Sequence, residues 1–156
     1  MNKQNQRQQI RMKGTGTIFF ISFVLMANLQ NSEGKRMSLD EVKEALLPLQ
    51  KYCIDKVGTD PKMIDDAAKG IFASDWKFQC YFKCVLLNTK IMKDDKIVEK
   101  ALKNIIETML LEEYIPPAMK AMEHCLSIVK KFKGCELAYE LAKCGYDYDS
   151  SAISFF

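Results

Sequence analysis

The stretch Cys53–Cys144 contains all six cysteines of the chain, and its centre reads Cys80-Tyr81-Phe82-Lys83-Cys84. The intervals between successive cysteines are 26, 3, 40, 9 and 8 residues. An even number of cysteines in a short chain, separated by helical sequence, is typical of a small secreted domain held by disulfides. Six cysteines permit fifteen pairings, so the count alone leaves the connectivity open.

Helix geometry constrains the arrangement of these cysteines. Cys80 and Cys84 are four residues apart, so they share one face of a helix and reach toward neighbouring elements. Cys135 and Cys144 are nine residues apart, which at about 100° per residue places them on opposite faces. The helix that carries the last two cysteines is therefore expected to be held from two sides.

Apolar periodicity and capping signals predict six helices and no strand. The first begins at the capping box Ser38-Leu39-Asp40-Glu41 and ends at Gly58, and Pro48 is expected to kink or split it. The other five are predicted at Pro61–Lys69, Ser74 to about Met92, Ile97–Leu110, Pro116 to about Phe132, and Cys135–Cys144 with a stop at Gly145. The predicted fold class is all-α, a compact six-helix domain stapled by disulfides.

Residues 1–34 are interpreted as a secretory signal peptide. Basic residues at positions 3–13 precede the apolar run Ile18–Ala27, and Ser32-Glu33-Gly34 resembles a cleavage site. The apolar run is shorter than the roughly 20 residues that span a bilayer, so a membrane anchor is the less favoured alternative. Cleavage near Gly34 leaves residues 35–156 as one domain. Met12-Lys13 would make a more ordinary start, with residues 1–11 as an extension.

The positive charge of the chain belongs to this leader. Four of the 23 basic residues and one of the 20 acidic residues lie in residues 1–34, so residues 35–156 carry nineteen of each sign. A mature chain with no net charge gives no reason to expect nucleic acid or an anionic membrane as a partner.

The six-cysteine pattern resembles that of the insect odorant-binding proteins, which have three residues between the second and third cysteines and eight between the last two. The resemblance implies the pairs Cys53–Cys84, Cys80–Cys135 and Cys125–Cys144. It also implies an apolar cavity between the helices that takes small hydrophobic ligands such as odorants, pheromones, fatty alcohols, esters or terpenoids. No cofactor and no metal are expected.

The resemblance and the apolar stripes together indicate the side chains that would line this cavity. The predicted ligand-binding residues are Leu49, Trp76, Leu86, Ile91, Val98, Leu102, Ile105, Met119, Met122 and Phe156. For each of them, an ordinary core position is an equally good interpretation. Some family members carry hydroxyl side chains in the stretches of Leu86 and Ile91, so the apolar residues here favour selection by shape. The hydroxyl groups of Tyr114, Tyr146 and Tyr148 are the candidates for a hydrogen bond to a ligand.

The C-terminal tail, residues 146–156, ends in Phe155-Phe156. Exposed apolar termini are unfavourable in water, so the tail is expected to fold back over the cavity, and a frayed end is the alternative. In some insect odorant-binding proteins, such a tail can form a wall or lid of the ligand cavity. His124, with Asp147 and Asp149, is a candidate for weakening that lid at low pH, and a merely exposed histidine is the favoured alternative.

Catalysis is not expected. His124 neighbours Cys125, but a disulfide removes the thiolate that a Cys–His nucleophile needs. Neither a phosphate-binding glycine loop nor a GxSxG motif occurs in the sequence.

The predicted function is a secreted carrier that delivers hydrophobic ligands to chemosensory receptors, in sensillar lymph or another secretion, as a monomer or weak homodimer. The alternatives are a carrier outside olfaction and a helical signalling or venom protein without a cavity.

Overall fold

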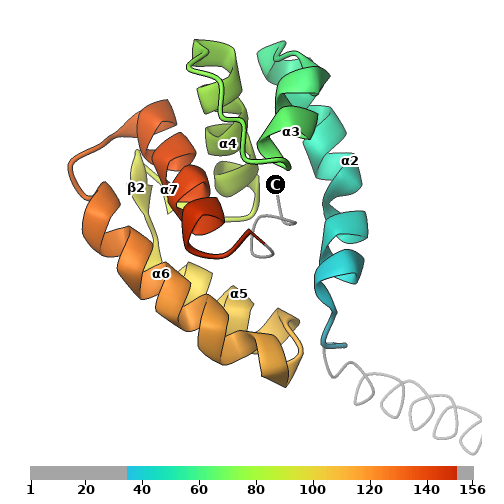
Figure 1. Cartoon of the computed structure of the whole chain (residues 1–156), viewed down its shortest axis with the longest axis vertical. Coiled ribbons are helices and arrows are strands. Elements are labelled where there is room, and N and C mark those ends of the chain that lie inside the picture. Colours follow the sequence, from blue (N-terminus) through green and yellow to red (C-terminus); the bar gives the residue numbers. More distant parts are fainter. Residues whose placement is uncertain (1–34, 151–156) are drawn as a thin grey trace, which may run out of the picture. The chain divides into compact units, whose positions relative to one another are not determined.

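The computed structural model describes residues 35–150 (Figure 1). Within this range the chain forms six α-helices, one 3-10 helix and one short β-hairpin. The elements are α2 (Leu39–Val57), α3 (Pro61–Ala67), α4 (Trp76–Asn88), β1 (Met92–Lys93), β2 (Lys96–Ile97), α5 (Glu99–Met109), η1 (Glu112–Tyr114), α6 (Ile115–Val129) and α7 (Gly134–Tyr148). The predicted all-α class with six helices is confirmed.

Local side chains explain where the helices begin. The Ser38 hydroxyl accepts a hydrogen bond from the backbone N–H of Glu41, and the Glu41 carboxylate accepts one from the N–H of Ser38, at 3.3 and 2.9 Å. Asp60 and Asp75 cap α3 and α4 in the same way, through bonds from backbone N–H groups. Each cap pairs a donor that the first helical turn cannot pair internally. Pro48 lies inside α2 without splitting it.

The prediction that no strand forms is wrong at one place. Helix α4 ends at Asn88, and Met92 pairs with Ile97 and Lys93 with Lys96 in a two-stranded antiparallel hairpin. Asp94 and Asp95 make the turn with φ of 49° and 59°, a left-handed conformation that aspartate tolerates. Two-residue strands are too short to produce a recognisable alternation of apolar and polar residues in the sequence. The hairpin also moves the start of α5 from Ile97 to Glu99.

The last helix is longer than predicted. It begins at Gly134, one residue before the predicted start at Cys135, and it continues through the predicted stop at Gly145 to Tyr148. The N–H of Asp149 still donates to the carbonyl of Gly145, at 3.0 Å. Glycine lowers helix propensity by only about 1 kcal/mol, and packing of the helix offsets that cost. Of the predicted tail, residues 146–148 are therefore helical, and residues 151–156 lie outside the described part of the chain.

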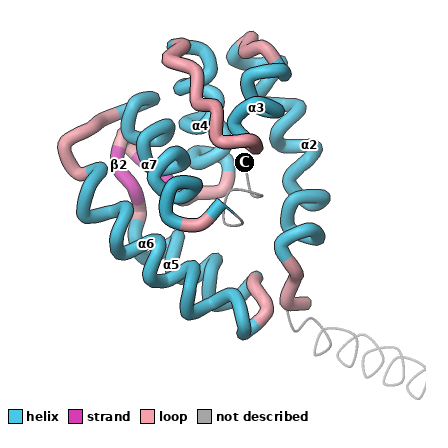
Figure 2. The backbone as a smooth tube through the Cα atoms, in the orientation of Figure 1, coloured by secondary structure: helices cyan, strands magenta, loops and turns pink. Residues whose placement is uncertain are grey.

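Helix α4 is central to the packing. It packs against α2 and α7, and α6 packs against α7 and α5 (Figure 1). The loop between α3 and α4 runs alongside α4 before that helix starts (Figure 2). An aromatic group joins the loop, α4 and α7 through ring contacts with centroids 5.0–6.3 Å apart: Phe72, Phe78, Phe82, Tyr139 and Tyr146.

Three disulfides join the helices. They link Cys53 to Cys84, Cys80 to Cys135, and Cys125 to Cys144, the same pairs that the resemblance implies. The first bond ties α2 to α4, the second ties α4 to the start of α7, and the third ties α6 to the end of α7. Helix α7 is thus held from two sides.

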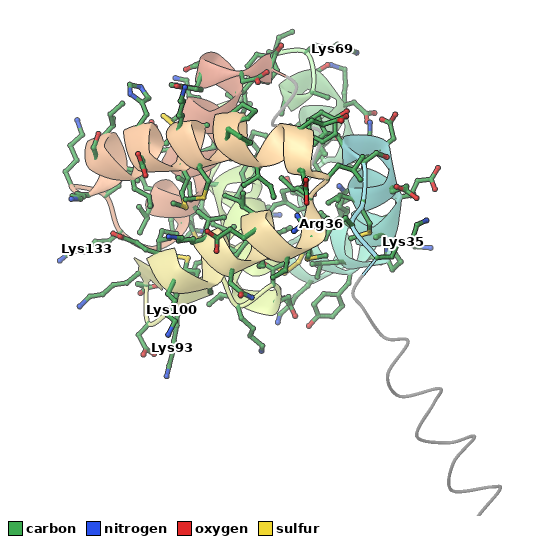
Figure 3. All side chains as sticks on the ribbon, turned by 90° about the horizontal axis from the view of Figure 1, so that it is seen from below. Lys35, Arg36, Lys69, Lys93, Lys100 and Lys133 are labelled. Atoms are coloured by element: carbon green, nitrogen blue, oxygen red, sulfur yellow. A yellow bond between two sulfur atoms is a disulfide. The ribbon has the colours of Figure 1, made fainter. Side chains whose placement is uncertain are left out.

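The segment before α2 is bound to the end of α5. The N–H of Met37 donates to Met109, the N–H of Leu111 donates to Met37, and the Arg36 guanidinium donates to the carbonyl of Leu110 at 3.0 Å. Lys93, Lys100 and Lys133, in contrast, extend outward into solvent (Figure 3). The N-terminal segment of residues 36–38, which we call the strap, is therefore attached to the end of α5 by hydrogen bonds.

Candidate ligand-binding site

The apolar interior consists of two clusters. The larger, which we call the α4–α7 cluster, is centred on the fully buried Phe78, Tyr81 and Phe82. The smaller, the α2–α5 cluster, is formed by the buried Val42, Ile106 and Leu110. The half-buried side chains of Leu102 in α5 and Met122 in α6 pack against both clusters. These two residues mark a seam where the two parts of the interior meet.

Among the predicted ligand-binding residues that the structure describes, Leu102 and Met122 pack against both clusters. Leu86 and Ile91 are buried members of the α4–α7 cluster. Leu49 and Ile105 are half-buried against that cluster, and Met119 is half-buried against the α2–α5 cluster. Val98 is half-buried at the start of α5. Predicted residues from α2, α4, α5 and α6 thus contribute to the apolar interior, although they are far apart in the sequence.

The structure does not place Trp76 in the interior, where the sequence analysis expected it to line the cavity. Its side chain is 69% exposed at the first residue of α4, so it does not line the interior. Trp76 and the buried Val85 are nine residues apart and therefore lie on opposite faces of the helix. Phe156, the last predicted residue, lies outside the described part of the chain.

Two hollows open on the surface of the domain, and neither is lined by a predicted ligand-binding residue. One of about 430 Å³ lies between α6 and α7, lined by His124, Ile128, Val129, Glu140, Lys143, Cys144, Asp147 and Tyr148. The other, of about 290 Å³, lies beside two disulfides and is lined by Lys56, Cys80, Lys83, Cys84, Leu87 and Asn88. Both are open to solvent and mix charged with apolar side chains.

The larger hollow contains most of the predicted pH-sensitive group. The ring of His124 lies against that of Tyr148, with centroids 5.1 Å apart, and Asp147 lines the same hollow. Asp149 is not among the lining residues. The proximity of His124 to the end of α7 is a tertiary feature that the order of residues does not show. Weakening of a lid by this group stays a prediction.

Contacts that the sequence did not signal fix the end of α7. The ring of Tyr146 lies against Gly70, whose φ is 85°, and a Cβ added at Gly70 would be 2.7 Å from the Tyr146 ring. Tyr146 also contacts Phe72 edge to face, with centroids 5.8 Å apart. The hydroxyl of Tyr139 donates to the carbonyl of Phe72 at 3.2 Å. These contacts attach α7 to the loop that precedes α4.

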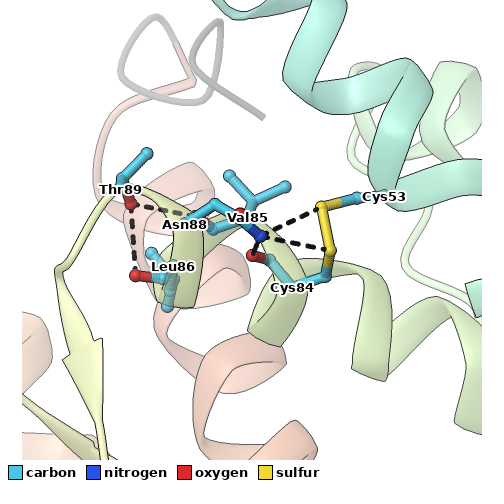
Figure 4. The surroundings of a disulfide bond; sticks show 6 residues. All are labelled: Cys53, Cys84, Val85, Leu86, Asn88 and Thr89. Carbon is cyan, nitrogen blue, oxygen red and sulfur yellow. Dashed lines mark hydrogen bonds between the residues drawn. A yellow bond between two sulfur atoms is a disulfide. The ribbon is translucent and has the colours of Figure 1, made fainter. Parts of the chain in front are cut away.

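The Cys53–Cys84 disulfide also has a polar neighbour. The side-chain amide of Asn88 donates to the carbonyl of Cys84 at 2.8 Å and lies 3.6 Å from Cys84 Sγ and 4.0 Å from Cys53 Sγ (Figure 4). Thr89 donates in the same way to the carbonyls of Val85 and Leu86. These bonds pair carbonyl groups at the C-terminal end of α4.

Charged groups are confined to the surface of the described domain. Lys83 pairs with Asp95 at 2.6 Å and links α4 to the hairpin turn. The pKa of Asp66 is lowered mainly by a hydrogen bond from Lys62 and, to a smaller extent, by the positive charge of the same lysine. Burial raises the pKa of Tyr81 and, together with the nearby Glu140, that of Tyr139. The interior thus contains neutral polar groups.

Two further searches concern residues 35–150 only. In that range, His, Cys, Asp and Glu side chains form no group of three or more that could hold a metal ion. None of the helices there combines the length and the apolar character needed to cross a bilayer.

Comparisons with solved structures identify the same architecture in insect proteins. Odorant binding protein 5 of Apis mellifera has a TM-score of 0.69 and 20% identity, covering 78% of this chain and 98% of its own. Odorant binding protein 4 of Chrysopa pallens has a TM-score of 0.65 and 30% identity, covering 71% and 92%. Odorant binding protein lmigOBP1 of Locusta migratoria has a TM-score of 0.59 and 22% identity, covering 80% and 93%.

Sequence comparison supports the same assignment. No curated protein matches the chain by sequence. The profile of the PBP/GOBP family matches residues 35–148, which contain all six cysteines and every described helix. This match covers well over half of the chain, and the chain belongs to the PBP/GOBP family of odorant-binding proteins.

Proposed function

We propose that this protein binds small hydrophobic ligands at the seam between its two apolar clusters and carries them to chemosensory receptors. The family consists of small-ligand odorant carriers, not of enzymes, and it is extracellular and disulfide-bonded. The observation that carries the proposed location is the packing of Leu102 and Met122 against both clusters while each remains half-buried. Burial of ligand surface there would contribute about 25 cal/mol per Å² before the costs of binding.

The ligand class follows from the side chains at the seam. Leucine, isoleucine and methionine have no hydrogen-bonding group that could distinguish polar ligands, and methionine adapts to several shapes. We therefore propose that odorants, pheromones, fatty alcohols or esters and terpenoids compete for one site. Selection by the side chains at the seam would depend on size and shape.

Displacement of a naphthylamine fluorescent probe tests this location. We expect Met122→Trp to weaken probe binding at least tenfold, because a larger ring would occupy the space between the clusters. The matched control is Met109→Trp in α5, since Met109 is exposed. The control should change the affinity less than twofold. Equal binding by wild type and Met122→Trp would refute the seam as the site, and the absence of probe binding to wild type would refute the carrier function.

We also propose that residues 1–34 are removed during secretion. The strap begins at Arg36, and Met37 is already hydrogen-bonded to α5, so cleavage near Gly34 would leave the anchored strap intact. Expression in insect cells, followed by N-terminal sequencing of the protein in the medium, tests this. A first residue near Lys35 is expected, and a retained leader would refute it.

A further inference from the structure

Two buried hydroxyl groups have no hydrogen-bond partner among the described residues. Tyr81 in α4 has no exposed surface, Thr59 after α2 is 5% exposed, and neither hydroxyl oxygen is paired. Other hydroxyls in the same core are paired: Tyr139 donates to Phe72 at 3.2 Å and Thr89 to Val85 at 2.9 Å. An unmade hydrogen bond in an apolar interior is unfavourable by roughly 1–3 kcal/mol, so two such groups require an explanation.

The two hydroxyls are on elements that face each other. The disulfide between Cys53 in α2 and Cys84 in α4 links the two helices, and the Cα atoms of these two cysteines are 5.7 Å apart. Past this bond the two helices continue until Gly58, at the end of α2, lies beside the Lys77 side chain of α4. Tyr81 lies between Lys77 and Cys84 on that face of α4, and Thr59 directly follows Gly58. Thr59 and Tyr81 are therefore on adjoining elements, the end of α2 and the first half of α4.

The chemistry of the pair selects a neutral partner. Burial alone raises the pKa of Tyr81, with no contribution from a charged neighbour, so its hydroxyl stays protonated and can donate. The Thr59 hydroxyl can donate or accept. Neither group can neutralise an ion, and a charge placed in this core would be strongly disfavoured. A single neutral oxygen atom can accept from the phenol and bond to the threonine at the same time.

We propose that Thr59 and Tyr81 form a buried polar site that binds one neutral oxygen atom between α2 and α4. The oxygen belongs to a water molecule or to the polar end of a carried ligand. Buried waters commonly bond to groups that are otherwise unpaired, and carbonyl or hydroxyl oxygens of odorants have the same chemistry. Only the second source rests on the proposed carrier function.

The sign of a stability change tests the site in the ligand-free protein. If a bound oxygen pairs the phenol, Tyr81→Phe should lower the folding equilibrium constant about fivefold, as Tyr139→Phe should for its bond to Phe72. If the phenol is unpaired, its removal should raise the constant. Tyr139→Phe is the matched control, since it removes one phenol from the same core. Thr59→Val should behave as Tyr81→Phe does.

The double variant tests whether the two groups share one oxygen. We expect the combined loss for Thr59→Val with Tyr81→Phe to be at least threefold smaller than the product of the single losses. A high-resolution crystal structure should show a density peak within hydrogen-bond distance of both hydroxyls. An increase in stability with Tyr81→Phe, independent effects of the two substitutions, or no density between the hydroxyls would overturn the proposal.

Ligand affinity then identifies the source of the oxygen. Dodecanal and dodecane have the same chain length, but only the first carries an oxygen. A roughly tenfold loss of dodecanal affinity in Tyr81→Phe, with less than twofold change for dodecane, would assign the oxygen to the ligand. Equal changes for both would assign it to water. If neither compound binds wild type, the carrier function fails, while the stability measurements still decide whether the site exists.

Discussion

The contact between Gly70 and Tyr146 shows how one residue can decide the course of a loop. Gly70 has a φ of 85°, a conformation that residues with a Cβ rarely adopt. The absence of a Cβ also lets the Tyr146 ring lie directly against its backbone. The same glycine therefore meets two independent requirements, one conformational and one steric.

Gly70→Ala should lower the free energy of unfolding by about 1–3 kcal/mol, because the alanine combines backbone strain with a clash against Tyr146. Gly58→Ala is the matched control. Gly58 also has a positive φ of 71°, but its nearest foreign atom is Lys77 Nζ at 3.8 Å, so only the strain applies. Urea unfolding should show the larger loss for Gly70→Ala, and equal losses would contradict the steric contribution.

Tyr81 should make the stability of the domain fall at alkaline pH. Burial raises the pKa of Tyr81 above its ordinary value of about 10, so the unfolded chain loses this proton at a lower pH than the folded one. The stability from the neutral buried phenol is complete below the ordinary pKa and is lost as the pH rises toward the folded value. Unfolding by urea between pH 8 and pH 11 should therefore show a smaller fall for Tyr81→Phe. Parallel curves for wild type and variant would contradict this.

At the scale of the element, caps and tertiary contacts define the helix ends together. The capping box at Ser38 and Glu41 starts α2 directly after the strap that binds α5. The cap thus fixes both the start of a helix and the direction in which the chain enters it. The last helix, α7, extends past Gly145 because two residues near its C-terminal end have tertiary contacts. Cys144 is bonded to α6, and Tyr146 packs against the loop before α4.

Ser38→Ala should lower the free energy of unfolding by about 1 kcal/mol, since it leaves backbone N–H groups of the first turn without a side-chain acceptor. Ser127→Ala in α6 is the control. The exposed Ser127 hydroxyl donates only to the carbonyl of His124 in its own helix. Thermal unfolding should separate the two variants, and a cost for Ser127→Ala as large as that for Ser38→Ala would refute a specific capping effect.

For the whole domain, the disulfides join α2, α4, α6 and α7, four of the six α-helices that the structure describes. The loops they close span 31, 55 and 19 residues. An interior that receives a ligand cannot be packed as tightly as a solid core, and cross-links can offset part of the lost packing energy. The bridges thus suit a carrier.

Replacing Cys80 and Cys135 by alanine should cost about 4 kcal/mol, and replacing Cys125 and Cys144 about 3 kcal/mol, because the first pair closes the longer loop. Both double variants remove the same atoms, so each is the control of the other. Chemical denaturation under non-reducing conditions measures the difference. The opposite order would show that local strain or packing outweighs loop length.

Much of this protein could be predicted from the sequence, because the signals involved are local. Three kinds of signal act within a few residues: the capping box, the helix-ending Gly58 and the helical spacing of apolar residues. The six helices could therefore be located without knowledge of the elements that pack against them. The spacing of Cys80 and Cys84 on one helix face, together with the other intervals, also sufficed to indicate the family.

What only the tertiary structure decided concerns directions and partners. Trp76 is in the predicted helix but on its outer face, and a helical stripe cannot show which neighbours cover it. Helix α7 passes through Gly145 because distant contacts outweigh a weak local preference. Neither the fit of Tyr146 against Gly70 nor the unpaired hydroxyls of Thr59 and Tyr81 can be read from the order of residues. Such features depend on which surfaces meet when the helices pack, and that is determined only when the whole chain is folded.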